Sequence, residues 1–387
     1  MRIGIDVRCL AEGKRTGVEE YTLALLQGLF ESDPLNEYIL FFNAWNKAVP
    51  DFILECAVKY PRVTLRAFHF PNKLLNLSLW YLRFPKLDRL VGGTDVFFLP
   101  NLNFAAVSDQ TKLVVTAHDL SFELFPETFS WKQRAWHFFI NFRHLLWRAD
   151  HIIAVSRSTQ DDLETQYGIL HNKVTVIPSG IGTQFRVMSR NDAELIRVQE
   201  KYHLPYRFIL SLATFEPRKN IIALIYAYEA LRRLGNPLFD KYALVIAGTK
   251  GWKYEEIFQA IARSPYKESI ILPGFIADVD KAALYNLASL FVYPSLYEGF
   301  GFPPLEAMAS GVPVIVSHSS SLPEIVASAG MLIDPYQPDE LFQALQHILS
   351  DQALADMLRQ KGIARAASFS WEKTAQATLA VFSSFRQ

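Results

Sequence analysis

The stretch from Leu290 to Ser310 reads LFVYPSLYEGFGFPPLEAMAS, and it decides how the fold of this chain is interpreted. It begins with four apolar residues that suit a buried strand, and it ends in helix formers that stop at Gly311. Pro303 and Pro304 can open that helix because the first helical positions need no N–H partner. The stretch therefore predicts a strand, a glycine loop and a helix N-terminus.

Two glutamates of this stretch, Glu298 and Glu306, lie eight positions apart. Free amides and the positive end of the helix dipole would face a site flanked by their carboxylates, which suits a polyol that carries a phosphate. Paired carboxylates can perform acid–base chemistry, as in glycoside hydrolysis, or accept hydrogen bonds from vicinal hydroxyls. Glu306 lies early in the helix, where a dipole-favoured glutamate is common, whereas Glu298 in the loop has no such structural reason.

Length and composition limit the kinds of protein that this chain can be. At 387 residues it exceeds the usual size of one core, so we expect two domains. Its formal charge of zero argues against nucleic acid as the main partner. Cys9 and Cys56 are too few for a disulfide framework and lack metal-ligand spacing. The segment Met1–Asp6 meets a charge too early for the apolar core of a signal peptide, and no apolar segment is long enough to span a membrane, so we predict a cytoplasmic protein.

Two segments carry an excess of basic residues, and the second of them is also rich in aromatic residues. Between Arg62 and Arg89 six basic residues are opposed only by Asp88, and Trp131–Arg148 carries basic and aromatic residues with no acid. This composition is typical of a helix that lies on an anionic membrane, which would make membrane contact peripheral. The alternative is a core helix whose basic residues face water.

Strand-like and helix-like segments alternate along most of the chain, which predicts right-handed βαβ crossovers and parallel sheets covered by helices on both faces. The strands predicted in the first half are Arg2–Val7, Tyr38–Phe42, Thr94–Leu99, Leu113–Thr116, His151–Val155 and Val174–Ile177. The helices predicted there are Val18–Phe30, Leu79–Leu90, Trp131–Arg148 and Ser158–Tyr167. The strands predicted in the second half are Phe208–Leu212, Leu244–Ala247, Ile270–Leu272, Leu290–Tyr293 and Pro313–Val316. The helices predicted there are Asn220–Leu234, Asp278–Leu287, Leu305–Ala309 and Asp339–Leu349.

A composition shift separates the two halves. Pro178-Ser179-Gly180 and the polar segment Ser189–Gln199 mark a candidate hinge. Ligands of open α/β sheets bind beyond the carboxyl ends of the strands, so a cleft between the two domains is the expected site.

The first cluster at a strand end is Gly13-Lys14-Arg15-Thr16-Gly17, which opens a helix. It is not GxGxxG, and Asp6 ends the preceding strand, so the sequence disfavours a nicotinamide dehydrogenase. Gly17 could let the backbone approach a phosphate, or it could be an ordinary helix-entry glycine.

Two more clusters follow predicted strands. His118, in Thr116-Ala117-His118-Asp119, is placed to bind a sugar hydroxyl or to move a proton; a structural histidine bonded to Asp119 is the alternative. Arg218 and Lys219 are adjacent cations at the start of a predicted helix, although the helix dipole favours cations at the other end. Residues that are unfavourable for local structure are often kept for a function, so we expect this pair to be functional. Together they can neutralise a diphosphate, and the alternative is a solvated surface pair.

With these clusters in place, Glu298–Glu306 resembles the EX7E signature of the retaining glycosyltransferase family 4, the group 1 glycosyltransferases of GT-B fold. Other segments fit that family in the same order: Pro178–Ile181, Glu216–Asn220, Pro273–Phe275, Gly311–Ile315 and Ser321–Glu324. The resemblance is strong from about Leu113 to Asp334 and looser before. It implies an α/β protein of two Rossmann-like domains that face each other across a cleft. The acceptor domain would be 1–183, joined by a C-terminal helix at 367–387 that crosses back, and the donor domain would be 184–366.

The resemblance also implies an activity. A hexose would pass from a nucleotide-sugar donor, of the UDP-glucose or GDP-mannose type, to a glycan or lipid-linked acceptor with retained anomeric configuration. No cofactor and no metal would be required, since Arg218 and Lys219 would stabilise the diphosphate leaving group. By analogy the process would be bacterial polysaccharide synthesis.

Particular residues take roles by this resemblance. The catalytic residues would be Glu298 beside the donor sugar, His118 on that sugar, and Arg218 with Lys219 on the diphosphate. Glu306 would accept hydrogen bonds from the ribose. The residues implied to contact the donor are Gly17, Arg218, Lys219, Gly274, Phe275, Ile276, Glu298, Gly299, Phe300, Gly301, Phe302 and Glu306.

One position departs from the family pattern. Many members carry a further arginine five residues before the Arg-Lys pair, where this chain has Ala213. The leaving group would then have one cation fewer. A GT-B sugar-nucleotide epimerase, a phosphorylase and a non-catalytic nucleotide- or glycan-binding module are the alternative functions.

Overall fold

The computed structural model describes residues 1–12 and 17–386, which form two compact units. Unit 1 consists of Met1–Phe122, Trp131–Gly180 and Ser370–Gln387. Unit 2 consists of Glu123–Ser130 and Ile181–Phe369. Both the beginning and the last helix of the chain therefore belong to unit 1.

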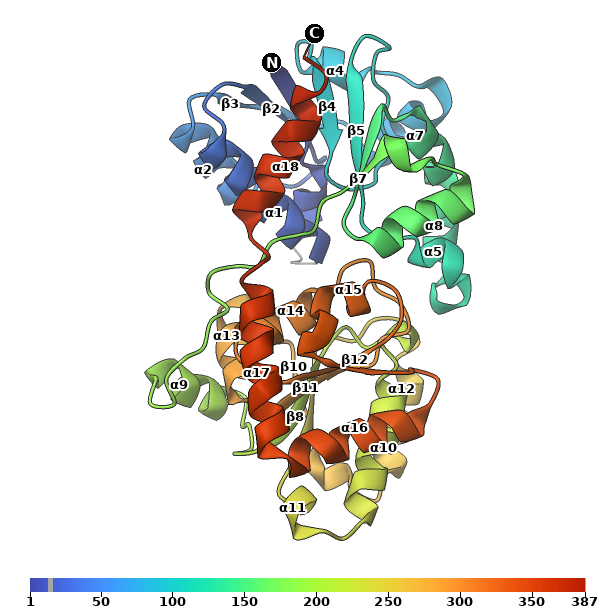
Figure 1. Ribbon diagram of the computed structural model, residues 1–387. Coiled ribbons are helices and arrows are strands. Elements are labelled where there is room, and N and C mark those ends of the chain that lie inside the picture. The colour runs from blue at the N-terminus through green and yellow to red at the C-terminus, as the bar shows by residue number, and fades with distance from the viewer. Residues whose placement is uncertain (13–16, 387) are drawn as a thin grey trace. The chain divides into compact units, whose positions relative to one another are not determined.

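Unit 1 is built on a parallel sheet (Figure 1). In the described residues its seven strands have the order β3-β2-β1-β4-β5-β6-β7. They are β1 (Arg2–Asp6), β2 (Glu37–Asn43), β3 (Val63–Phe68), β4 (Val96–Leu99), β5 (Lys112–Ala117), β6 (His151–Ala154) and β7 (Val174–Val176). The central strands are continuous apolar runs, and Val96–Leu99 is buried at every position. This is the pattern expected when both faces of a parallel sheet are covered.

Helices cover this sheet, and the last of them comes from the far end of the chain. They are α1 (Gly17–Ser32), α2 (Asp51–Lys59), α3 (Asn72–Leu77), α4 (Leu87–Leu90), α6 (Trp131–Ile140), α7 (Phe142–Arg148), α8 (Arg157–Tyr167) and α18 (Trp371–Ser383); the short α5 (Ser121–Leu124) ends in unit 2. Helix α18 lies beside α1 (Figure 1), and a Cβ at Gly28 of α1 would come within 3.0 Å of Ala375 Cβ. The absence of a side chain at Gly28 lets the two helices approach this closely.

Unit 2 repeats the same plan. The described part of it has a six-stranded parallel sheet of order β10-β9-β8-β11-β12-β13. The strands are β8 (Phe208–Leu212), β9 (Ala243–Ala247), β10 (Ile270–Gly274), β11 (Leu290–Tyr293), β12 (Val314–Ser317) and β13 (Met331–Ile333). The helices are α9 (Ala193–Lys201), α10 (Ile221–Arg233), α11 (Pro237–Asp240), α12 (Glu255–Arg263), α13 (Asp278–Leu287), α14 (Phe302–Ala309), α15 (Leu322–Val326), α16 (Pro338–Ser350) and α17 (Gln352–Ala366). Leu224 of α10 and Leu345 of α16 are fully buried in one core with Leu244 of β9.

The predicted α/β fold with two parallel sheets is confirmed, and the differences are local. Strands β3 and β13 were not predicted, because β3 is an edge strand with a half-exposed pattern and β13 has only three residues. The predicted helix Leu79–Leu90 is wrong. A π turn, η2 (Ser78–Leu82), ends at Arg83 in the left-handed region (φ +51°), and Pro85 cannot continue a helix.

Two further segments differ from their predictions. The predicted helix Trp131–Arg148 is broken at Asn141 (φ +49°), whose side chain accepts a hydrogen bond from the His144 N–H. The polar segment that marked a candidate hinge contains the start of α9. None of the helices in the described ranges combines the length and the apolar composition needed to cross a bilayer.

Candidate functional site

Three neighbouring strands of unit 2 end side by side. β8, β11 and β12 are adjacent in the sheet. β8 leads to a turn that carries Arg218 and Lys219, β11 to a loop that carries Ser295 and Glu298, and β12 to Ser320. Because parallel strands run in one direction, these polar residues meet at the carboxyl edge of the sheet, where ligands of such sheets bind.

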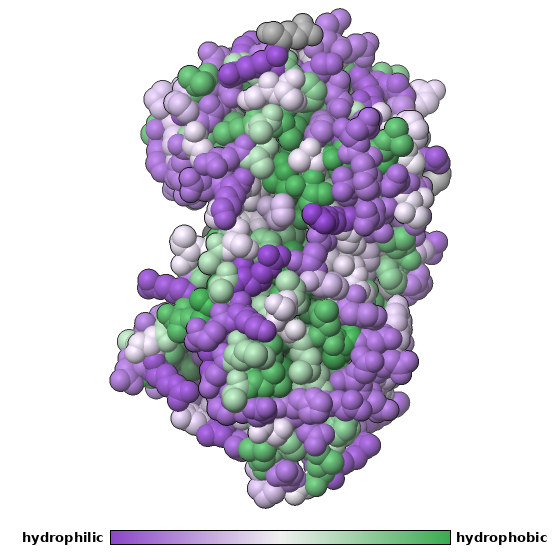
Figure 2. Space-filling model, viewed as in Figure 1, coloured by the Kyte–Doolittle hydropathy of each residue, from purple (hydrophilic) through white to green (hydrophobic). Residues whose placement is uncertain are grey.

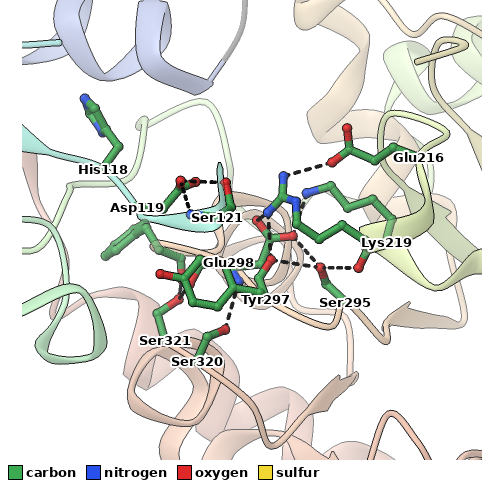
Figure 3. Close-up of polar contacts among 12 residues, drawn as sticks. His118, Asp119, Ser121, Glu216, Lys219, Ser295, Tyr297, Glu298, Ser320 and Ser321 are labelled. Atoms are coloured by element: carbon green, nitrogen blue, oxygen red, sulfur yellow. Dashed lines mark hydrogen bonds and ion pairs between the residues drawn. The ribbon is translucent and has the colours of Figure 1, made fainter. Parts of the chain in front are cut away.

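Lys219 and Glu298 form a buried ion pair at this edge. The Nζ atom of Lys219 lies 2.5 Å from Oε1 of Glu298 and donates to the hydroxyl of Tyr293 at 2.8 Å. The hydroxyl of Ser295 donates to the same carboxylate oxygen at 2.6 Å. Figure 3 shows the side chains of Lys219 and Ser295 directed toward Glu298. Lys219 is only 9% exposed and Glu298 8%, so the pair is held away from bulk water.

Arg218 extends the pair into a chain of alternating charges. Its Nη1 lies 3.4 Å from Oε2 of Glu298 and donates to the carbonyl of Tyr297 at 2.7 Å. Its Nη2 donates to Oε1 of Glu216 at 2.8 Å. Arg218 thus lies between two carboxylates and Lys219 beside one of them, and the four formal charges sum to zero. The predicted alternative of a solvated surface pair for Arg218 and Lys219 is wrong.

The neighbouring cations set the protonation of Glu298. Burial alone would raise its pKa, but Lys219, Arg218 and the hydroxyl of Ser295 together lower the pKa of Glu298 to about 2. Burial and the nearby Glu298 charge raise the pKa of Tyr293, so its phenol keeps its proton. At neutral pH Glu298 is therefore a carboxylate and cannot donate a proton.

The loop after Glu298 is fixed by the residues that follow β12. The Glu298 N–H donates to Oγ of Ser320 at 2.8 Å, and Oγ of Ser321 donates to the carbonyl of Phe300 at 2.8 Å (Figure 3). Gly301 has a φ of +107°, and a Cβ there would lie 2.7 Å from Cδ2 of Leu322. Helix α14 begins at the next residue with prolines in its first turn, as predicted.

Glu306 has other partners than Glu298. It is buried in α14, and its Oε2 accepts a hydrogen bond of 2.7 Å from the hydroxyl of Tyr285 in α13. The two glutamates therefore differ in their surroundings, since Glu298 meets two cations and Glu306 a tyrosine hydroxyl.

The predicted base-contacting segment follows β10 at the outer side of the same sheet. Gly274 has a φ of +79°, which favours glycine, and its carbonyl accepts a hydrogen bond of 2.9 Å from the N–H of Gly248. Phe275 is 63% exposed, whereas Ile276 is buried. The Phe275 ring is therefore available to a flat ligand at this end of the sheet.

His118 and Gly17 belong to unit 1. The Nε2–H of His118 donates to the carbonyl of Pro100 at 2.8 Å, while the carboxylate of Asp119 accepts from Ser121. The alternative of a histidine bonded to Asp119 is therefore wrong. Burial lowers the pKa of His118, so the ring is neutral at pH 7. Gly17 is the exposed first residue of α1, and the predicted loop Gly13–Thr16 lies outside the described residues.

Comparison with known proteins identifies the family. Residues 192–365 match the model for glycosyl transferases group 1, and residues 15–185 match the model for Glycosyltransferase Family 4. The O-antigen chain mannosyltransferase B of Escherichia coli is 32% identical over 380 residues, which cover 94% of this chain and 95% of that protein. The chain belongs to glycosyltransferase family 4.

Other similar proteins differ in length or share only the fold. The serotype-specific mannosyltransferase WbdA of Escherichia coli is 35% identical over 278 residues, 71% of the family 4 chain but only 34% of WbdA. The chain thus spans about a third of the length of that relative. Sucrose-phosphate synthase from Thermosynechococcus elongatus superposes with a TM-score of 0.74 at 19% identity and covers 99% of this chain and 98% of its own. The family 4 chain has the GT-B fold.

Several residues of the unit 2 site received no role from the sequence. They are Glu216, Tyr293, Ser295, Ser320 and Ser321. Their signal is position, because each lies at or just after the carboxyl end of a strand or in the turn that follows it, at the edge of the sheet where the predicted site residues also lie. Their partners could not be found this way, since the hydrogen bond from Lys219 to Tyr293 joins residues 74 positions apart.

The family 4 chain also has Ala213, which is partly buried, in place of an arginine, and the backbone carbonyl of Ala213 lies against Gly248. A Cβ at Gly248 of the neighbouring turn would fall 1.8 Å from the Ala213 carbonyl oxygen. Within the described ranges, no three side chains of His, Cys, Asp or Glu are grouped as metal ligands. Arg218 and Lys219 are the two cations that lie beside Glu298 in the unit 2 site.

Proposed function

We propose that this chain is a retaining hexosyltransferase. It transfers a hexose from a nucleotide-sugar donor to a glycan or lipid-linked acceptor in bacterial polysaccharide synthesis. We propose mannose as the sugar and GDP-mannose as the donor to test first. One relative that is similar over 94% of this chain and another that is similar over 71% of it are both named mannosyltransferases. UDP-glucose is the second donor to test. We further propose that the protein is cytoplasmic, which its two free cysteines favour.

The buried chain of charges around Glu298 carries the proposal. Arg218 and Lys219 are desolvated and oriented before any donor binds, and such preorganised cations stabilise a developing negative charge far better than solvated ones. In the proposed mechanism the donor diphosphate binds beside Glu298 as a further partner of both cations. The cations then stabilise the nucleoside diphosphate as it leaves, without a metal ion.

The carboxylate of Glu298 has a separate role in this mechanism. With a pKa of about 2 it stays ionised, so it can stabilise positive charge on the sugar but cannot act as an acid. Glu306 accepts hydrogen bonds from the ribose, and Phe275 and Ile276 contact the base. The amides of the loop from Gly299 to Phe302 bind the sugar or phosphate.

Unit 1 would supply the remaining contacts. Neutral His118 carries its proton on Nε2, so Nδ1 is left as an acceptor for a sugar hydroxyl. Gly17 would approach the diphosphate, and the rest of unit 1 would bind the acceptor.

The test is a transfer assay with GDP-mannose, UDP-glucose and dTDP-glucose against glycan and lipid-linked acceptors. We expect one donor to be used, the product to keep the anomeric configuration by NMR, and a chelator to leave the rate unchanged. Lys219→Ala should lower the rate by about 100-fold or more, as removal of one transition-state contact does. Lys241→Ala, an exposed lysine of the same unit, is the matched control.

Two results would contradict the proposal. Full activity of Lys219→Ala would show that Lys219 does not stabilise the diphosphate. Unchanged turnover of Glu298→Gln would show that Glu298 does not stabilise the charge on the sugar. Conversion of the donor without acceptor would indicate an epimerase, and a requirement for inorganic phosphate would indicate a phosphorylase.

A further inference from the structure

A run of large apolar side chains is exposed on unit 1, at and just after the π turn η2. Trp80 is 41% exposed, Tyr81 76%, Leu82 64% and Phe84 65%. Single exposed apolar residues are ordinary, and the face shown in Figure 2 has hydrophobic residues in several places among hydrophilic ones. Four in five consecutive positions are not ordinary, and such patches mark a surface that something else covers.

The backbone holds these side chains outward. The hydroxyl of Ser78 donates to the carbonyl of Phe84, which closes the turn, and Arg83 between them is in the left-handed region. Nη2 of Arg83 lies 2.9 Å from Nε2 of His144 in α7. The exposed turn is thus tied to a neighbouring helix.

Helix α6 continues the same surface. The Trp80 ring meets the Phe139 ring edge-on, with centroids 5.5 Å apart. Phe139 and Trp136 of α6 are 48% and 44% exposed. We call Trp80, Tyr81, Leu82, Phe84, Trp136 and Phe139 the aromatic surface.

The charges on these two segments have one sign. Residues 72–87 and 131–149 contain no aspartate or glutamate, and Asp88 just beyond the first segment is buried. Lys73, Arg134 and Arg143 are exposed. A second copy docked by the same surface would bring cation against cation. An anionic lipid headgroup layer complements the charge, and tryptophan and tyrosine suit the boundary between headgroups and acyl chains.

We propose that the aromatic surface docks unit 1 onto a bilayer that contains anionic lipid. Leu82 and Phe84 enter the acyl region, Trp80 and Tyr81 lie at headgroup level, and the basic residues bind lipid phosphates. The inference rests on exposure and charge alone and holds whatever donor the enzyme uses.

Sedimentation of the full chain with vesicles tests this proposal. The vesicles are phosphatidylcholine alone, or phosphatidylcholine mixed with phosphatidylglycerol. We expect binding to the mixed vesicles only. The variant Y81S/L82S/F84S should bind the mixed vesicles with an affinity that is lower by about tenfold or more, because three apolar side chains no longer enter the bilayer.

A matched variant controls for loss of apolar surface as such. L170S/Y206S/Y336S changes residues that are 62%, 78% and 66% exposed elsewhere on the chain and should bind vesicles as the natural protein does. The charge variant K73E/R134E/R143E should lose the preference for phosphatidylglycerol. Circular dichroism and donor turnover in solution should be unchanged in all three variants, so a failure here is distinct from a failure of the proposed function.

Three outcomes would overturn the proposal. They are equal binding to both kinds of vesicle, equal loss in the matched control, and no vesicle binding by the natural protein. Sedimentation equilibrium distinguishes the other occupant, since self-association that Y81S/L82S/F84S abolishes would assign the surface to a second copy.

Discussion

At the scale of single residues, the ion pair of Lys219 and Glu298 belongs to the candidate site and also affects the stability of unit 2. Each side chain is a buried charge whose main partner is the other. Replacing only one partner of such a pair by an uncharged residue lowers the free energy of unfolding far more than replacing both, because the remaining charge stays buried without an opposite charge.

The first prediction uses this asymmetry. Lys219→Met should lower the free energy of unfolding by roughly 3–5 kcal/mol, since it leaves Glu298 near Arg218 alone. Adding Glu298→Gln should recover most of this loss while transfer stays absent. Urea unfolding of the single and double variants measures both values. A double variant less stable than Lys219→Met would contradict the account.

A second prediction concerns the glycine that shapes the loop. Gly301→Ala must place a side chain at a φ of +107° and 2.7 Å from Leu322, so it should cost about 1–3 kcal/mol and weaken nucleotide binding. Gly235→Ala has a φ of +58° but no atom within 4 Å, and it should cost about 1 kcal/mol with binding unchanged. Calorimetric titration with GDP and UDP compares the two. Equal effects on binding would show that the loop shape does not matter.

Sequence reasoning reached the site residues but not their contacts. Glu298, Arg218 and Lys219 were identified by type and by their place after strands. Their mutual bonds were not, because they join β8 to β11 across 79 positions and depend on the strand order. Sequence alone also left His118 with two interpretations, and the bond from its Nε2 to the Pro100 carbonyl excludes Asp119 as the partner that one of them named.

At the scale of elements, α9 and α13 are joined by one buried carboxylate. Asp280 accepts hydrogen bonds from Lys201 Nζ at 2.6 Å and the Tyr202 hydroxyl at 2.7 Å, and it contacts Arg197. The same tyrosine oxygen accepts from the N–H of Ala277, next to Ile276. This contact therefore also steadies the segment that is proposed to meet the base.

The third prediction is a pH dependence. Burial would raise the pKa of Asp280, but Lys201, Tyr202 and Arg197 lower it from 3.8 to about 2. Because the folded pKa is below the unfolded one, Asp280 stabilises unit 2 fully above pH 3.8 and loses this effect as the pH falls to about 2. We expect this contribution of Asp280 to the free energy of unfolding to be about 1 kcal/mol, because Arg197 and Lys201 are half-exposed and solvent screens their charges.

Urea unfolding across this acid range measures the effect. Asp280→Asn should flatten the fall of stability with acid, whereas Asp240→Asn, which removes a more exposed partner of Arg232, should leave the slope unchanged. The same slope in Asp280→Asn and the natural protein would exclude the linkage.

Elements were predictable where the pattern of apolar residues was long and uniform. The strand Phe208–Leu212 was placed without error because all its residues are buried. The segment Leu79–Leu90 was read as a helix because its leucines repeat at helical spacing, but Pro85 and the turn at Arg83 break it. The apolar residues of this segment are exposed, but in the sequence they have the same pattern as the buried face of a helix. Sequence alone does not show whether an apolar residue is exposed or buried.

At the scale of the whole molecule, unit 1 depends on a helix from the end of the chain. Phe382 of α18 is fully buried and meets Phe98 of β4 edge-on, with ring centroids 5.3 Å apart. Thr374 donates to the carbonyl of Pro178 at 2.8 Å, so α18 also fixes the end of the segment Trp131–Gly180 of unit 1.

A fourth prediction follows from this packing. Phe382→Ala should lower the stability of unit 1 by about 3–5 kcal/mol, as truncation of a buried aromatic does, with nucleotide binding by unit 2 kept. Met357→Ala, at a 44% exposed position of α17, is the control and should change neither. Differential scanning calorimetry with and without nucleotide separates the two units. Loss of binding along with stability would show that the units do not act separately.

The order in which the chain is made gives α18 a further consequence. Residues 181–369 must leave the ribosome between the last strand of unit 1 and this helix, which takes roughly 10 to 40 s at about 5–20 residues per second. For that time the face of α1 around Gly28 has no cover, although the rest of its unit is complete. We expect the nascent chain to need a chaperone there, and a chain that ends before residue 370 to have a complete unit 2 but an unfinished unit 1.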